Sequence, residues 1–195
     1  MQPLPVTAAM LTLALSVSFA LAAVSLDATV DTYEVSGTTF PQIMRSLQEN
    51  APYIERTKRR HYGVTRLSFT QEATFQEARD GCELLSNDIG LKVEMVLPEW
   101  IDRDRAADGV AARWDRLSES IAAHEERHVA IAQDYLRRMR RELDRAMTAP
   151  TCERLRAMIR TRMEALIEQH RAAQEGFDEE VRQQNAGSGE AGQRG

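Results

Sequence analysis

Residues 110–135 read VAARWDRLSESIAAHEERHVAIAQDY, and this stretch decides the fold. Its apolar side chains and its histidines recur at alternating steps of four and three residues, at Val110, Trp114, Leu117, Ile121, His124, His128, Ile131 and Tyr135. This spacing is typical of an amphipathic α-helix whose marked face packs against a core. We therefore predict one helix from about Val110 to Met147, with His124 and His128 on its core-facing stripe.

The pentapeptide His124-Glu125-Glu126-Arg127-His128 lies in the middle of that stripe. Residues four apart on an α-helix lie on one face about one turn from each other, so the two imidazoles can bind one Zn²⁺. Glu125 projects roughly 100° around the helix from His124 and can reach a metal-bound water as general base. The alternative is a pair of structural histidines, since Glu126 and Arg127 replace the uncharged residues usual in zinc peptidases. We predict Zn²⁺ as the cofactor and Glu125 as the catalytic residue.

A second helix is expected after Ala149-Pro150 interrupts the first, with Thr151 as a suitable N-cap. Its inner stripe consists mainly of apolar residues, namely Cys152, Leu155, Ile159, Met163, Leu166, His170, Ala173, Phe177 and Val181. The two helices together are expected to form a hairpin.

A tight hairpin places His170 within about one residue of the level of His128. We therefore predict His170 as the third zinc ligand, beside His124 and His128. Asp178 and Glu175 remain alternatives, because the geometry of the turn can shift the register by several residues. The remaining interpretation is that His170 is an ordinary histidine of the helix seam.

Asp134 is a weaker candidate for the third ligand. It has the spacing of the HExxHxxGxxD motif, in which a glycine bends the chain back toward the metal. Ile131 stands at the glycine position. On a straight helix Asp134 points roughly 80° to the other side of His124, away from Glu125.

The first half of the chain favours β-structure, with strand-like segments at residues 26–39, 62–75 and 91–97. Pro98 is expected to end the last of these, and Asp80-Gly81 indicates a tight turn. A short helix is expected from Pro41 to Asn50, with Thr39 as its cap. We therefore expect the α+β class, with a small antiparallel β-sheet of three or four strands packed against a long C-terminal helical hairpin that carries a zincin-like active-site helix.

The chain has 195 residues, enough for one domain with extensions. Residues 1–26 carry no charged side chain, and Ala20-Leu21-Ala22 resembles a signal-peptidase site. We predict a signal peptide at 1–22, a zincin-like domain at 23–184 and a disordered tail at 185–195. An uncleaved membrane anchor is the alternative for the first segment. After cleavage we expect no stable membrane span, and a secreted or periplasmic protein.

Cys82 and Cys152 are the two cysteines of the chain. An oxidising compartment outside the cytoplasm lets them pair, so we predict a disulfide between them. The formal net charge is −5, and the arginines alternate with acidic residues along the predicted helices. This pattern predicts no nucleic-acid partner.

Four landmarks lie along the chain: YEVSGTT at 33–39, the Gly81-Cys82 step, LPEW at 97–100, and the spacing from Trp114 to the HEERH pentapeptide. Together they resemble the bacterial Domain of Unknown Function 922 family. Phe177-Asp178 is similar to the start of an aromatic-Asp segment near that family's end, although Val181 and Gln183 stand where Thr and His are common. The family is described as predicted secreted zinc-dependent proteases, so the resemblance implies export and peptide-bond hydrolysis.

The sequence therefore predicts a secreted or periplasmic zinc metallopeptidase acting on a peptide or protein substrate in the cell envelope. A sheet edge near the site is expected to hold an extended peptide by strand addition. The rival hypothesis is a non-catalytic envelope adaptor that binds a partner through its helical hairpin and keeps a structural or vestigial metal site. That hypothesis gives no reason for Glu125 between two inward histidines.

Overall fold

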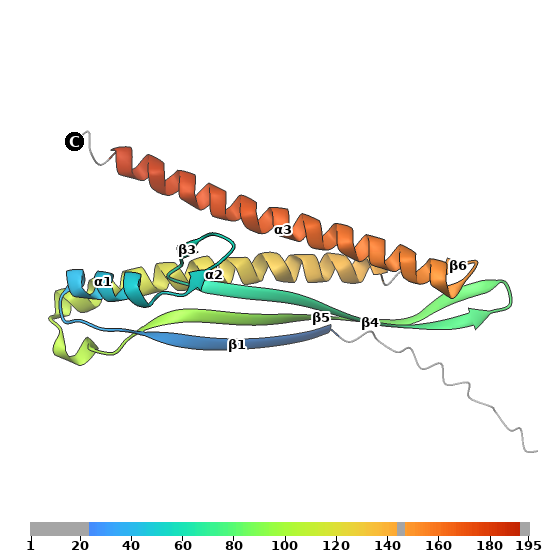
Figure 1. The fold of residues 1–195 in the computed structure, drawn as a ribbon, viewed down its shortest axis with the longest axis horizontal. Helices are drawn as coiled ribbons and strands as arrows, with labels where there is room; N and C mark the ends of the chain where they lie inside the picture. The colour runs from blue at the N-terminus through green and yellow to red at the C-terminus, as the bar shows by residue number, and fades with distance from the viewer. Residues whose placement is uncertain (1–23, 144–146, 192–195) are drawn as a thin grey trace, which may run out of the picture.

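A computed structural model describes residues 24–143 and 147–191 of the chain. The elements are β1 (Val24–Val35), α1 (Phe40–Asn50), β2 (Tyr53–Ile54), β3 (Arg59–Arg60), β4 (Val64–Ala78), β5 (Gly81–Trp100), the 3₁₀ turn η1 (Arg103–Arg105), α2 (Asp108–Leu143), β6 (Thr148–Ala149) and α3 (Cys152–Ala191). Figure 1 shows α2 and α3 on one side of a long, narrow sheet, with α1 at one end. The α+β class is confirmed. The predicted signal peptide lies outside the described residues.

The main sheet is mixed, so the prediction of a purely antiparallel sheet is wrong. Its strand order is β1-β5-β4, and β6 pairs with β5. β4 and β5 form an antiparallel hairpin, whereas β1 runs parallel to β5. β4 starts at the end of the sheet where β1 stops. The returning β5 lies between the two, and it therefore runs in the direction of β1.

β5 continues through Pro98, so the prediction that this proline ends the strand is also wrong. β4 begins at Val64, opposite Val96. Beyond that point β5 pairs only with β1 among the described residues, with Pro98 opposite Tyr33. Proline has no backbone N–H to donate, and a strand position with a free edge can do without that donor.

The predicted tight turn between β4 and β5 is confirmed. Ala78 pairs with Gly81, so Arg79 and Asp80 form the turn. Gly81 has φ +144°, and a Cβ at this position would lie 2.4 Å from the carbonyl oxygen of Ala149. Glycine is therefore needed for the backbone conformation and for the close approach of β6.

Two groups of buried side chains hold α2 against the rest of the fold. The larger one joins α2 and α3 to the sheet through Leu91, Val93, Leu136, Met139, Leu155 and Ile159, among others. The smaller one joins α1 to the beginning of α2 through Val35, Ile43, Leu47, Trp100 and Trp114. The HEERH pentapeptide lies between these two cores.

The helical hairpin is longer than predicted at its C-terminal end. α2 spans Asp108–Leu143, and the predicted end near Met147 falls beside residues 144–146, which lie outside the described residues; α3 continues past Asn185 to Ala191. The segment predicted as a disordered tail is therefore helical as far as Ala191. Figure 1 shows that α3 is inclined to α2 and moves away from it toward the C-terminus. Within residues 24–143 and 147–191, no helix has the length and hydrophobicity that a membrane crossing requires.

The predicted disulfide between Cys82 and Cys152 is present. Cys82 is 2% exposed at the start of β5, and Cys152 is the first residue of α3. β6 brings them together, because Ala149 pairs with Cys82. The bond closes a loop with a sequence separation of 70, for which loss of chain entropy in the unfolded state is worth about 4 kcal/mol.

Replacing both cysteines, as Cys82→Ser/Cys152→Ser, is expected to lower the free energy of unfolding by about 2–4 kcal/mol, because the open chain gains freedom when unfolded. Urea unfolding measures this change. Reductant should move the wild-type midpoint toward that of the variant and leave the variant unchanged. Equal midpoints, with both wild-type thiols free to react with a label, would contradict the prediction.

Candidate metal centre

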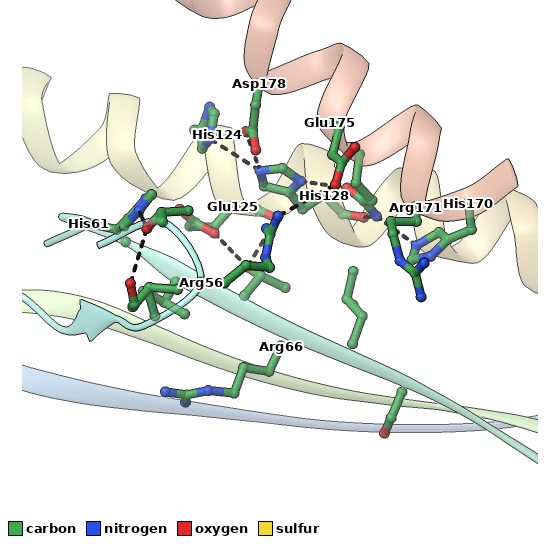
Figure 2. Close-up of a pocket in the computed structure, with 18 of the residues that line it drawn as sticks. Arg56, His61, Arg66, His124, Glu125, His128, His170, Arg171, Glu175 and Asp178 are labelled. Atoms are coloured by element: carbon green, nitrogen blue, oxygen red, sulfur yellow. Dashed lines mark hydrogen bonds and ion pairs between the residues drawn. The ribbon is translucent and has the colours of Figure 1, made fainter. Parts of the chain in front are cut away.

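The buried face of α2 passes through Glu125 rather than through the two histidines. Glu125 is 5% exposed, whereas the side chains of His124 and His128 are 31% and 13% exposed. Glu125 faces β4, and the imidazoles lie in the seam toward α3 (Figure 2). The predicted core-facing stripe is corrected here, because both histidines lie at its edge, where they reach α3.

A carboxylate from α3 completes a triangle of ligand atoms with the two imidazoles. Asp178 Oδ1 lies 3.3 Å from His124 Nε2 and 3.1 Å from His128 Nε2. The two Nε2 atoms are 3.2 Å apart. Among the described residues these three form the one group of His, Cys, Asp or Glu side chains close enough to share a metal ion. Figure 2 shows Asp178 reaching down from α3 toward both rings.

This triangle has the size of one face of a tetrahedral zinc site. Zn²⁺ binds histidine nitrogen and carboxylate oxygen at about 2.0–2.2 Å, so tetrahedral ligands lie about 3.4 Å from one another. The observed separations of 3.1, 3.2 and 3.3 Å need only small adjustments. Three protein ligands leave the fourth position for water or substrate, as in catalytic zinc sites.

The electrostatics of the triangle favour a cation at its centre. Hydrogen bonds with His124 and His128 hold the pKa of Asp178 well below its usual range. Burial lowers the pKa of His128, but hydrogen bonds with Asp178 and Gln174 outweigh burial and leave this pKa above its ordinary value. The carboxylate is therefore ionised, and the site attracts either protons or a metal ion.

Phe177 packs against both imidazoles. Its ring is stacked on His124 with centroids 4.9 Å apart, and it meets His128 edge-on at 5.1 Å. These contacts restrict the rotation of the two rings. Phe177 directly precedes Asp178 in the chain, and it thus orients the two imidazoles that Asp178 contacts.

Glu125 is held by the first residues of β4. Thr65 Oγ1 donates a hydrogen bond to Glu125 Oε2 at 2.8 Å. A Cβ on Gly63 would lie 2.7 Å from both Cγ and Oε1 of Glu125. Only glycine leaves room here for the carboxylate, so strand and helix together set its position.

His170 lies beside the triangle but is not part of it. It is 9% exposed, and its ring meets Phe69 and Tyr135 edge-on at 5.0 and 5.5 Å. Its Nε2 is 2.8 Å from Nε2 of Gln174. Burial lowers the pKa of His170. The geometry favours Asp178, one of the two predicted alternatives, over His170 as the third ligand.

The other candidates for the third ligand lie farther from the triangle. Glu175 forms a 3.4 Å ion pair with Arg56, from the loop between β2 and β3. Asp134 is exposed and pairs with Arg137 one turn along α2. Neither carboxylate belongs to the group that can share a metal with the two imidazoles.

The register of the two helices explains why Asp178 is favoured. A tight turn places Arg171 level with His128, but the structure places Gln174 there instead, with Nε2 3.0 Å from the carbonyl oxygen of His128. α3 is therefore shifted by almost one helical turn. The shift moves His170 farther from the two imidazoles and brings Asp178 level with His124.

A cavity of about 630 Å³ is lined by Glu125, Asp178 and the chain's four histidines, among others. His61 is the one that the sequence did not single out. It follows β3, with Nε2 2.7 Å from Thr57 Oγ1.

Sequence reasoning also missed Gln174, Thr65 and Gly63. Gln174 had a detectable signal, because it stands four residues after His170 and four before Asp178, on the same helix face. Thr65 and Gly63 had none, since their importance depends on the side chain that α2 places against them.

One comparison with known proteins gives a result. The family model described as "Bacterial protein of unknown function (DUF922)" matches residues 30–186, which include every residue of the site. No curated protein and no solved structure matches the chain significantly. The chain belongs to this bacterial family of unknown function, Domain of Unknown Function 922.

Proposed function

We propose that this protein is a zinc-dependent peptidase of the bacterial cell envelope. In this proposal His124, His128 and Asp178 bind Zn²⁺, and Glu125 is the general base. One observation carries the proposal. Three ligand atoms 3.1–3.3 Å apart share a cavity with the buried Glu125, which lies in the same turn of α2 as the two histidines. This combination of ligands and base is the one that metal-assisted hydrolysis uses.

The chemistry divides between the ion and the chain. Zinc held by the triangle would lower the pKa of water to about 7 and polarise the scissile carbonyl. Glu125 takes the proton from the attacking water and gives it to the leaving amine. The hydrogen bond from Thr65 holds this carboxylate in one orientation. Phe177 limits the movement of the imidazoles.

The edge of β4 suggests how a peptide is held. Six consecutive residues, 64–69, line the cavity. Successive side chains of a strand point to opposite faces of the sheet, so a cavity over one face is lined by every second residue. Consecutive residues line a cavity only where the edge of the strand faces that cavity. β5 is the only strand paired with β4 among the described residues. An extended peptide can add to the open edge and lie beside the metal centre.

Export is part of the proposal. A disulfide that links the sheet to α3 favours an oxidising compartment. The uncharged residues 1–26 are consistent with a cleaved signal peptide. The proposed substrates are therefore extended peptides or unfolded protein segments of the envelope.

Purified protein is expected to bind about one zinc ion per chain, measured by elemental analysis after desalting. Asp178→Ala and His128→Ala should lose it, because two protein ligands rarely hold a catalytic zinc. Glu175→Ala is the matched control, an acid on the same helix that lines the same cavity, and it should keep the ion.

Two results would overturn parts of this prediction. Zinc lost in His170→Ala but kept in Asp178→Ala would assign the third ligand to His170. No zinc in the wild-type protein after reconstitution with excess metal would reject the metal centre and favour the adaptor hypothesis.

Glu125→Gln is expected to reduce peptide cleavage by about 10²–10⁴-fold, because general acid–base catalysis contributes that much to rate. Zinc content should stay unchanged, since the three ligands remain. Turnover would be measured on a peptide found by unbiased library cleavage. Glu126→Gln, a neighbouring exposed acid, should cleave at the wild-type rate. Wild-type turnover by Glu125→Gln would place the activity elsewhere.

A further inference from the structure

The amide of Gln174 contacts two histidines at once. Its Oε1 lies 2.5 Å from Nδ1 of His128, and its Nε2 lies 3.0 Å from the backbone oxygen of the same residue. The same Nε2 is 2.8 Å from Nε2 of His170. All three contacts involve atoms outside the triangle of ligand atoms, on His128 itself or on the neighbouring His170.

The backbone contact decides which way the amide points. A carbonyl oxygen only accepts hydrogen bonds, so the group facing it must be the NH₂. A flipped amide would set two oxygens against each other. The NH₂ therefore donates one hydrogen to the His128 carbonyl and the other to His170, and Oε1 is left to accept from His128 Nδ1.

This arrangement assigns the tautomers of both rings. His128 carries a proton on Nδ1, so Nε2 is the ring nitrogen left for the triangle, where it either donates a proton to Asp178 Oδ1 at 3.1 Å or binds a metal ion in place of that proton. His170 accepts at Nε2 and carries its proton on Nδ1. Its Nε2 cannot bind the metal while it holds Gln174.

His170 in turn is held by aromatic rings on two other elements. Phe69 of β4 and Tyr135 of α2 meet its ring edge-on. Rotation of the Gln174 amide would break its bond to a ring that is itself fixed. The buried His170 thereby stabilises the amide orientation without touching the metal centre.

We infer that Gln174, supported by His170, is a positioning residue that keeps His128 in the tautomer that binds metal. The inference rests on the proposed zinc site. Without Gln174 no group accepts the Nδ1 proton, and a neutral His128 ring then keeps its one proton on Nε2, where Asp178 accepts it. That proton must leave before an ion binds. Removing a residue that hydrogen-bonds a metal ligand typically lowers metal affinity by about 10–100-fold.

The first test is zinc affinity, measured by competition with a chromophoric chelator. Gln174→Leu keeps a similar volume and should weaken zinc binding by about 10–100-fold. Gln174→Glu keeps an acceptor for His128 Nδ1 and should bind zinc more tightly than Gln174→Leu. Gln169→Leu, an exposed glutamine on the same helix, is the matched control and should bind like wild type.

The second test reads the tautomers directly. Long-range ¹H–¹⁵N spectra of histidine-labelled protein resolve the four rings. In metal-free wild type His128 should carry a proton on Nδ1, alone or together with one on Nε2 that Asp178 accepts, and neutral His170 should carry its proton on Nδ1. Added zinc should shift Nε2 of His128 and leave Nε2 of His170 unchanged.

The outcomes separate this inference from the proposed function. Equal zinc affinity for wild type and Gln174→Leu would overturn the inference and leave the zinc site standing, and so would a metal-free His128 that carries no proton on Nδ1. A zinc-dependent shift at His170 Nε2 would also overturn it. If the wild type binds no zinc, the proposed function fails, and the metal-free tautomers still decide whether Gln174 orients His128.

Discussion

The burial of one face of the β4–β5 hairpin under α2 and α3 is the constraint on which the rest of the structure depends. β5 supplies Leu91 and Val93 to the interior, and α2 and α3 lie across them. Because α2 is also held at its beginning by the Trp100–Trp114 core, its rotation about its own axis is set from both ends. That rotation turns Glu125 toward the sheet and the two histidines toward α3.

The rotation of α2 has a free-energy cost, because it buries the carboxylate of Glu125. A buried carboxylate is unfavourable unless hydrogen bonds or opposite charge compensate for lost hydration. Glu125 receives a hydrogen bond from Thr65, a neutral donor that by itself compensates little for a charge. A cation at the nearby triangle would lower this cost for Glu125. The burial of Glu125 is therefore compatible with the proposed metal ion.

The connection between the helices decides which residues meet at the seam. β6 pairs with the start of β5, and the disulfide ties Cys152 to Cys82, so α3 begins at a set point on the sheet. From that point its inclination brings Gln174 and Asp178 to the level of the histidines. A connection one helical turn different would place other side chains there. The site thus depends on contacts far from it in space.

The sequence by itself determined the α+β class, the helix with HEERH, the β4–β5 turn and the pairing of the cysteines. These features follow from local periodicity, from turn chemistry and from a choice between only two thiols. It did not determine the parallel pairing of β1, because strand direction depends on which strand occupies the centre of the sheet. Only the tertiary structure decided that Asp178 rather than His170 joins the imidazoles. The reason is physical: a helix register is the sum of the turn, the tilt and the packing, and a change of one turn replaces every side chain at the seam.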